Sequence, residues 1–214
     1  ALTTEVKHRE VFKKQTGGRG KFADIEVFIG PADDNNKGLD FKNEIRGGNI
    51  PREYIPSVEK GFKNAMFNGP LAGFAIEGLK VRLTDGSFHS VDSDQLSFEI
   101  CARQAFKHAA SKANPVMLEP IMAVEVVTPE EYMGDVLSDL NTRRAQVQGM
   151  DQVGDNSVVT ALVPLAEMQR YVSDLRSITQ GRGVFSLEFA DYQQVPTHLK
   201  EQIIANSKKE AEDK

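Results

Sequence analysis

The sequence predicts a mixed α+β fold in which strands and helices alternate over 214 residues. Strand-like apolar runs are separated by polar turns, helical segments carry apolar residues on one face, and the second half repeats a strand–helix–strand pattern. Two such units in succession are typical of a ferredoxin-like split βαβ sandwich. We therefore expect α+β domains followed by one final helix.

The first half is predicted to contain four extended segments and two helices. The extended segments are residues 3–9, 22–29, 41–46 and 75–84. A first helix follows Pro51 and Pro56, and a second is expected to begin at Asp92, with Gln95 completing a capping box and a turn at residues 85–86 before it. The residues expected to face the core are Val58, Phe62, Ala65 and Met66 in the first helix and Leu96, Ile100, Ala102, Ala105, Phe106 and Ala109 in the second.

The second half is predicted to contain four strands and two helices. The strands are residues 121–127, 145–151, 158–163 and 184–189. Thr128 is the expected N-cap of one helix, with Pro129 in its first turn, and the other helix is expected to begin at Pro164. The final helix, residues 197–207, has too few apolar residues to stand alone and must dock on one of the domains, whereas the charged tail after it is expected to fray.

Composition limits the classes of function. The net charge of −5 argues against a general nucleic-acid-coating protein, so any RNA binding must come from local patches. The single Cys101 excludes an internal disulfide and is expected to be a buried, inert thiol. Neither a membrane span nor a signal peptide is present, and the start at Ala1 suggests a fragment of a longer, soluble cytoplasmic protein.

A glycine-rich cationic loop is the first candidate binding site. It runs from Lys14 through Gln15, Thr16, Gly17, Gly18, Arg19 and Gly20 to Lys21. Glycines let a backbone approach a partner closely, and the flanking cations favour phosphate. The spacing does not match a nucleotide-binding loop, so we expect RNA contact here, with a plain surface turn as the alternative.

A second candidate is the turn that contains Phe88, His89 and Ser90. An exposed aromatic ring and a histidine can stack on bases or bind ribose and phosphate. The alternative is that Phe88 belongs to the core and His89 is merely exposed.

Arginines close both helices of the second half. Arg143 and Arg144 follow one helix, and Arg176 and Arg182 surround a glycine turn after the other. Cations at helix C-termini are favourable through the helix dipole, and Gly181 suits the left-handed residue that ends a helix. The Arg176–Arg182 segment is alternatively a phosphate-facing loop.

No catalytic or metal site is expected. The four histidines, His8, His89, His108 and His198, are scattered in the sequence, and one cysteine cannot build a zinc site. There is no nucleophile elbow. The glycine loop leads into a strand rather than a helix start, which argues against a small-molecule kinase.

Six segments together resemble the C-terminal half of bacterial elongation factor G. They are residues 15–20, 47–56, 69–73, 88–93, 118–122 and 175–182. The resemblance implies that residues 1–118 form domain IV, a ribosomal-protein-like domain with a left-handed βαβ arrangement, and that residues 119–194 form the ferredoxin-like domain V. It also implies that residues 195–214 form a C-terminal helix that packs back on domain IV.

The resemblance implies the C-terminal ribosome-binding half of a GTPase that drives translocation of tRNA and mRNA. Domain IV would enter the small-subunit decoding region, and its tip loops would touch the tRNA–mRNA duplex. The implied tip residues are Gln15, Thr16, Gly17, Gly18, Arg19, Gly20, Lys21, Phe88, His89 and Ser90. The residues implied to contact large-subunit RNA at the stalk base are Arg176, Ser177, Gln180, Gly181 and Arg182.

GTP and Mg²⁺ would bind to an N-terminal domain that is missing here, so we expect a monomeric, non-enzymatic module without a cofactor. Two departures from the family pattern, Lys21-Phe22-Ala23 after the glycine loop and Ser90 after the tip histidine, leave open a paralogous recycling or ribosome-protection GTPase.

Overall fold

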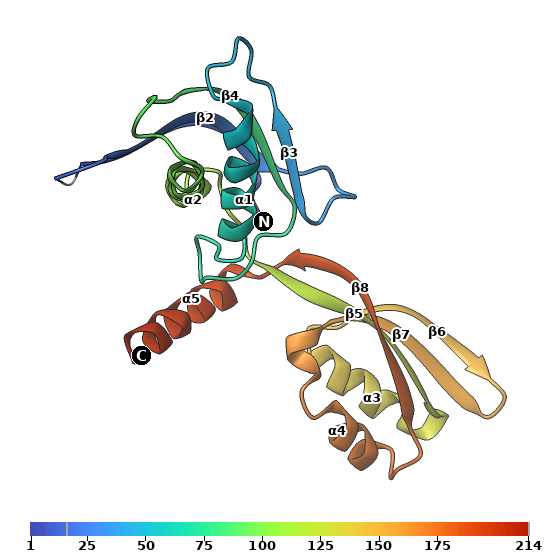
Figure 1. Cartoon of the computed structure of the whole chain (residues 1–214). Coiled ribbons are helices and arrows are strands. Elements are labelled where there is room, and N and C mark those ends of the chain that lie inside the picture. Colours follow the sequence, from blue (N-terminus) through green and yellow to red (C-terminus); the bar gives the residue numbers. More distant parts are fainter. Residues whose placement is uncertain (16, 214) are drawn as a thin grey trace. The chain divides into compact units, whose positions relative to one another are not determined.

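The chain folds into two compact α+β units, which confirms the predicted fold class. Figure 1 shows the computed structural model, which describes residues 1–15 and 17–213. The first unit contains Ala1–Met117 together with Pro196–Lys214, and the second contains Leu118–Val195. Each unit has its own four-stranded sheet and its own hydrophobic core. None of the helices in the described part of the chain is long and apolar enough to span a membrane.

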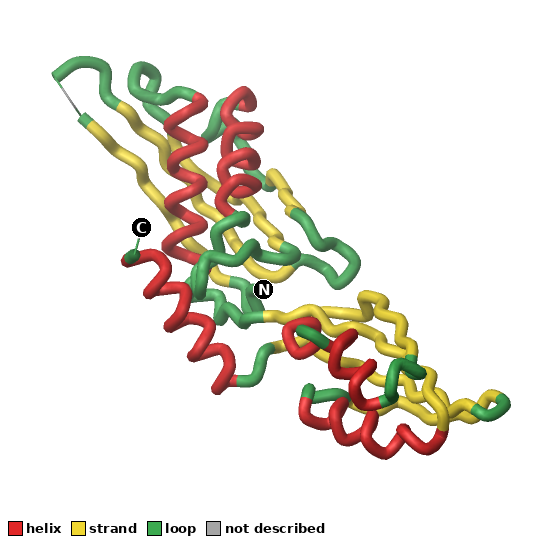
Figure 2. The backbone as a smooth tube through the Cα atoms, turned by 90° about the horizontal axis from the view of Figure 1, so that it is seen from below, coloured by secondary structure: helices red, strands yellow, loops and turns green. Residues whose placement is uncertain are grey.

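The first unit packs two helices on one face of its sheet. Its elements are β1 (Val6–Lys14), β2 (Lys21–Pro31), β3 (Leu39–Asn43), a 3-10 turn at Arg52–Tyr54, α1 (Ile55–Ala65), β4 (Leu79–Ser87), α2 (Gln95–Ala110) and α5 (Thr197–Glu212). The strand order is β1-β2-β4-β3, and only β3 and β4 are parallel, joined by the crossover through α1. Figure 2 shows α1 and α2 running side by side along the strands.

Strand alternation explains this core. In β2, Ala23, Ile25, Val27 and Ile29 are fully buried because side chains two residues apart point to the same face. α1 and α2 approach closely at Gly61, where a Cβ atom would lie 2.5 Å from the carbonyl oxygen of Glu99.

The buried face of α2 differs from the expectation at two positions, Leu96 and the half-buried Ile100. Leu96 is exposed, and Phe98 and Cys101 are buried in its place. The reason is helical periodicity: the buried stripe runs through Phe98, Cys101, Ala102 and Ala105, and Leu96 and Ile100, four residues apart, lie beside it.

The expected start of α2 at Asp92 is wrong. Asp94 is the N-cap, and its carboxylate accepts a hydrogen bond of 2.7 Å from the backbone N–H of Ser97. The expected turn at residues 85–86 is also wrong, because β4 continues to Ser87 and pairs with a bulged β2. Gly86 permits this pairing, since a Cβ atom there would lie 2.3 Å from the carbonyl oxygen of Asp24.

The final helix α5 is longer than expected. It continues to Glu212, beyond the start of the predicted frayed tail. Its apolar residues Leu199, Ile203 and Ile204 are half-buried, and the Ser207 hydroxyl donates a hydrogen bond of 3.1 Å to the carbonyl oxygen of Ala72. The helix is therefore tied to the segment before β4.

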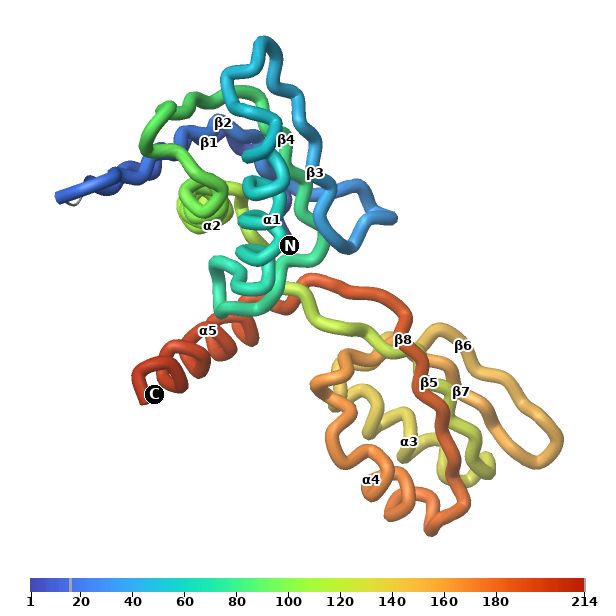
Figure 3. Tube along the Cα trace, viewed as in Figure 1, coloured from blue at the N-terminus to red at the C-terminus, as the bar shows by residue number. Residues whose placement is uncertain are grey.

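The second unit has the predicted ferredoxin-like topology. Its elements are β5 (Leu118–Pro129), α3 (Glu130–Thr142), β6 (Gln146–Val153), β7 (Asn156–Pro164), a 3-10 turn at Leu165–Met168, α4 (Tyr171–Ile178) and β8 (Val184–Gln194). The strand order is β6-β7-β5-β8, and all neighbouring strands are antiparallel. Figure 3 lets the reader follow the trace from β5 through α3, β6, β7 and α4 to β8, which returns beside β5.

Two expected helix starts in this unit are wrong. Thr128 does not cap α3: it pairs with Ser157 in the sheet, and Pro129 is the N-cap without a side-chain hydrogen bond. α4 does not begin at Pro164, which pairs with Ile121 at the end of β7. A 3-10 turn and the left-handed Arg170 come before α4, so sheet pairing overrides the local helix signals.

Candidate nucleic-acid interface

Two loops of the first unit form the candidate interface. The hairpin loop, residues 15–20, joins β1 to β2, and the helix loop, residues 88–94, joins β4 to α2. Together they are called the paired loops below. In Figure 3 the hairpin of β1 and β2 extends beyond the helices of its own unit.

Hydrogen bonds hold the two loops together. Arg19 Nε donates to the carbonyl oxygen of Val91 at 2.8 Å, and the backbone N–H of Gly20 donates to Asp92 Oδ1 at 3.0 Å. The backbone N–H of Phe22 donates to the carbonyl oxygen of Asp92 at 2.8 Å. Loops that are distant in the sequence therefore form one surface, and Arg19 and His89 belong to the same end of the unit.

Ser93 is the central residue of this connection. Its side chain is buried, accepts a hydrogen bond of 2.9 Å from the backbone N–H of His89, and donates one of 2.7 Å to the carbonyl oxygen of Phe22. The sequence places Ser93 near a helix start, but its link to Phe22 depends on β2 and could not be predicted locally.

The ring of His89 is oriented by its own loop. Nδ1 accepts hydrogen bonds of 3.2 Å from the backbone N–H groups of Val91 and Asp92. A carboxylate oxygen of Asp92 lies 3.6 Å from the same nitrogen. We assign the neutral ring with its hydrogen on Nε2, because two backbone donors already point at Nδ1. The side chain is 54% exposed.

Most of the predicted tip residues lie on the surface. Gln15, Gly17, Gly18, Arg19, Phe88, His89 and Ser90 are exposed, Lys21 is half-buried and Gly20 is buried. Thr16 lies outside the described residues. Phe88 is 44% exposed, so the alternative in which it belongs to the core is wrong.

The strand ends that flank the hairpin loop are cationic although the whole chain is acidic: Lys13, Lys14 and Lys21 join Arg19 there, against the two carboxylates of the helix loop, Asp92 and Asp94. Lys13 and Lys14 are exposed and have no salt-bridge partner among the described residues. The guanidinium of Arg19 binds carbonyl oxygens, which leaves its charge uncompensated, whereas Lys21 pairs with Asp94 at 3.2 Å. Burial alone would raise the pKa of Asp94, but hydrogen bonds from Ser97 and Lys21 outweigh it and lower the pKa.

The second candidate surface is residues 176–182, which comprise the last turn of α4 and the loop after it. Arg176, Ser177, Gln180, Gly181 and Arg182 are all exposed. The backbone N–H of Gly181 donates to the carbonyl oxygen of Arg176 at 2.8 Å, which closes the helix in a Schellman-type turn. Gly181 has the expected left-handed backbone at φ 79°, and Gln180 before it has φ 51°. The helix is therefore capped by both residues.

The two arginines of this surface differ in their surroundings. Arg182 pairs with Glu131 at 2.9 Å and lies over the ring of Tyr132. Arg176 forms no salt bridge within residues 1–15 and 17–213. The capping interpretation and the phosphate-facing interpretation are compatible, since capping uses backbone groups and leaves the side chains outside.

Arg143 and Arg144 have structural roles. Arg143 is only 8% exposed and binds Asp139 and Asp174, while Arg144 donates two hydrogen bonds, of 2.8 and 3.0 Å, to Glu119. The hydrogen bond to Glu119 raises the pKa of Arg144. Neither guanidinium is available to an RNA backbone.

Two of the four histidines, although far apart in the sequence, lie close together in the structure. His8 and His108 both lie within hydrogen-bond distance of the Glu10 carboxylate. His8 and Glu10 are two residues apart on one strand, which places them on the same face and is a signal that the sequence does contain. Only the fold brings in His108.

Known proteins share this architecture. A family model described as elongation factor G, domain IV, matches residues 1–114, and one described as elongation factor G C-terminus matches residues 116–203. The chain belongs to the elongation factor G family. The resemblance read from the six sequence segments is thereby confirmed.

Individual relatives agree with this assignment. The chain is 57% identical to elongation factor G of Amoebophilus asiaticus and 56% identical to that of Cytophaga hutchinsonii, in each case over 97% of its length. It spans only 29% and 30% of these two curated relatives. A crystal structure of a protein from Thermus thermophilus superposes with a TM-score of 0.87 at 42% identity, covering 97% of the chain and 31% of that protein.

Proposed function

We propose that the chain is the ribosome-binding C-terminal part of a translation elongation factor that promotes GTP-dependent translocation of tRNA and mRNA. Family membership and the paired loops support this proposal. The single observation that carries it is that the hairpin loop and the helix loop form one surface, with exposed glycines, an exposed aromatic ring and a histidine, beside the exposed Lys13 and Lys14 of β1.

In this proposal the paired loops enter the decoding region and contact the tRNA–mRNA duplex. Lys13 and Lys14 meet backbone phosphates, because exposed ammonium groups bind phosphate without any sequence preference. The ring of Phe88 stacks on a base or ribose, and His89 donates a hydrogen bond from Nε2. Glycines 17 and 18 keep the hairpin loop slim enough for close approach.

The second unit would contact large-subunit RNA at the stalk base through residues 176–182. The exposed Arg176 is the strongest phosphate-binding candidate of this surface, since Arg182 already pairs with Glu131. Two separated anchoring surfaces would hold the factor on both ribosomal subunits.

The chain itself would make and break no covalent bonds. GTP and Mg²⁺ would bind elsewhere in the parent protein, which would act as a cytoplasmic monomer. The role of this part is steric and electrostatic: by occupying space that tRNA has vacated, the paired loops bias movement in one direction.

The test uses the full-length factor with His89→Ala and Gln15→Ala. Both substitutions remove exposed side chains of the paired loops, so we expect slower translocation in rapid kinetics at an unchanged rate of GTP hydrolysis. His198→Ala and Gln202→Ala on α5 are the matched controls and should translocate at the wild-type rate.

Unchanged translocation in both loop variants would refute the proposal. Measuring ribosome recycling with the same proteins decides between a translocase and a paralogous recycling or protection GTPase. A factor that splits ribosomes but does not translocate would establish the second function.

A further inference from the structure

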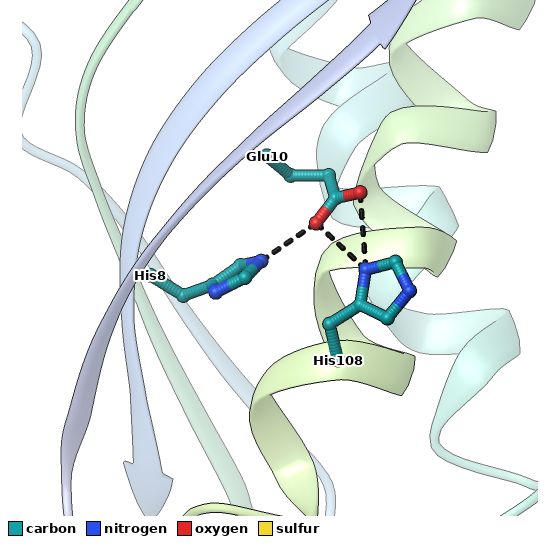
Figure 4. Close-up of side chains that lie close together, drawn as sticks. All are labelled: His8, Glu10 and His108. Carbon is teal, nitrogen blue, oxygen red and sulfur yellow. Dashed lines mark hydrogen bonds and ion pairs between the residues drawn. The ribbon is translucent and has the colours of Figure 1, made fainter.

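Two histidines and a glutamate meet at the edge of the first unit, away from the paired loops. Figure 4 shows His8 and Glu10 on β1 and His108 on α2, with both rings directed at the carboxylate. β1 is the edge strand of its sheet, and His108 lies in the last turn of the helix that covers it.

The distances within this group are short. His8 Nε2 lies 2.6 Å from Glu10 Oε2, and His108 Nδ1 lies 2.9 Å from the same oxygen and 3.1 Å from Oε1. One ligand atom from each of the three residues falls within 4.8 Å of the others. Each ring therefore presents one nitrogen to a shared point beside the carboxylate.

The burial of the three side chains suits a bound cation. The side chains of His8 and Glu10 are 16% and 11% exposed, whereas that of His108 is 52% exposed. The carboxylate lies within hydrogen-bond distance of both rings in a largely dry position, open to solvent on the His108 side.

We propose that His8, Glu10 and His108 form a binding site for a divalent transition-metal ion, with Zn²⁺ as the ion that fits best. Two imidazole nitrogens and one carboxylate oxygen are a donor set that zinc commonly takes, with water in the fourth position. The site does not depend on the proposed ribosomal function.

The two contacts with the carboxylate require only a small adjustment. Bonds of 2.0–2.1 Å in a tetrahedral site place neighbouring donor atoms about 3.3 Å apart. The contact of 2.6 Å between His8 and Glu10 would widen by roughly 0.7 Å, and that between His108 and Glu10 by less. His108 can move because its side chain is half exposed, and water reaches the fourth position from the same side.

Metal binding requires only that each histidine ring move its hydrogen to its other nitrogen. A carboxylate only accepts hydrogen bonds, so His8 carries its hydrogen on Nε2 and His108 on Nδ1 in the metal-free arrangement. On binding, the ion replaces these hydrogens and each neutral ring carries its hydrogen on the other nitrogen instead. The bound ion would clamp β1, which leads into the hairpin loop, to α2.

The direct test titrates ZnCl₂ into the tag-free 214-residue chain at neutral pH and measures the heat of binding. We expect one ion per chain and a higher unfolding temperature in the presence of Zn²⁺ than with EDTA. Co²⁺ should give the visible absorption of a four-coordinate site. His108→Ala should weaken Zn²⁺ binding at least about tenfold, since it removes one of three protein ligands.

His198→Ala is the matched control, because it removes an exposed histidine outside the group and should leave Zn²⁺ binding unchanged. Since His8 is largely buried, circular dichroism must establish that His8→Ala is folded. If it is not, His108→Gln at the exposed position gives the same test. Absence of stoichiometric binding to the wild-type chain, or equal binding by wild type and a folded His108 variant, would overturn the proposal.

Discussion

Replacing Ser93 by alanine should weaken the connection between the helix loop and the start of β2. The hydroxyl accepts a hydrogen bond from the backbone N–H of His89 and donates one to the carbonyl oxygen of Phe22. Alanine fits in the same space but can make neither bond. The substitution therefore acts on this connection rather than on packing.

The size of the expected loss of stability follows from the burial of the Ser93 side chain. Ser93 is only 4% exposed, so water cannot fully replace the hydroxyl for the two backbone groups. Each hydrogen bond contributes about 0.5–1.5 kcal/mol net, so the loss of two predicts a decrease of about 1–3 kcal/mol in the free energy of unfolding of the first unit. The neighbouring bonds of Arg19 and Tyr54 to the backbone carbonyl of Ser93 should remain.

Urea unfolding followed by far-ultraviolet circular dichroism measures this effect, because the chain has no tryptophan to report by fluorescence. Amide hydrogen exchange gives the local readout: the N–H of His89 should lose protection. Ser90→Ala is the matched control, since Ser90 is exposed and makes no side-chain hydrogen bond in the described part of the chain.

A Ser93→Ala protein whose free energy of unfolding lies within about 0.5 kcal/mol of wild type, with the His89 amide equally protected, would refute the inference that Ser93 joins the helix loop to the start of β2.

Three further predictions concern helix packing, helix capping and the buried thiol. Gly61→Ala should destabilise the first unit by about 1 kcal/mol, because overpacking against Glu99 exceeds the gain in helix propensity. Gly134→Ala on α3 is the comparison: no atom lies within 4 Å of the new Cβ, so it should stabilise the second unit by up to about 1 kcal/mol. Thermal unfolding of the two variants measures both effects. Asp94→Ala should cost about 1 kcal/mol at pH 7 through the lost helix cap. Folding lowers the pKa of Asp94, so the difference in the free energy of unfolding between wild type and Asp94→Ala should persist above pH 3.8, the usual pKa of an aspartate, and vanish as the pH falls further. A difference that grows in acid would contradict this prediction. Burial raises the pKa of Cys101 to about 12, so a thiol reagent at pH 8 should label it only after unfolding; rapid labelling of the native chain would show that the helix interface opens.

Periodicity predicts the elements of this chain better than their ends. The alternation in β2 and the repeat in the second half lead directly to the two α+β units. The helix starts at Thr128 and Pro164 fail, because capping signals are local whereas a strand continues as long as its neighbour pairs with it. The start at Asp92 fails because Asp92 binds the backbone of Gly20 and Phe22, and Asp94 caps the helix instead.

The candidate binding residues were predictable only in part, because the sequence shows the type of a residue but not its partners in the fold. Exposed glycines and cations in a loop can be recognised in the sequence, and Gly17, Gly18 and Arg19 are exposed as expected. The partners of a side chain depend on the fold. Arg143 and Arg176 have similar positions at helix ends, yet Arg143 is buried among carboxylates and Arg176 is exposed.

The backbone contact between Gly20 and Asp92 limits how the two loops can vary. A side chain at position 20 would begin with a Cβ atom 3.1 Å from the carboxylate of Asp92 and 3.2 Å from the carbonyl oxygen of Lys14. Any larger residue there would require the Asp92 carboxylate to shift by a few tenths of an ångström, which would disturb its hydrogen bond with the backbone N–H of residue 20. Engineered libraries that diversify one loop should therefore randomise the other at the same time, because a substitution tolerated beside one partner sequence would be rejected beside another.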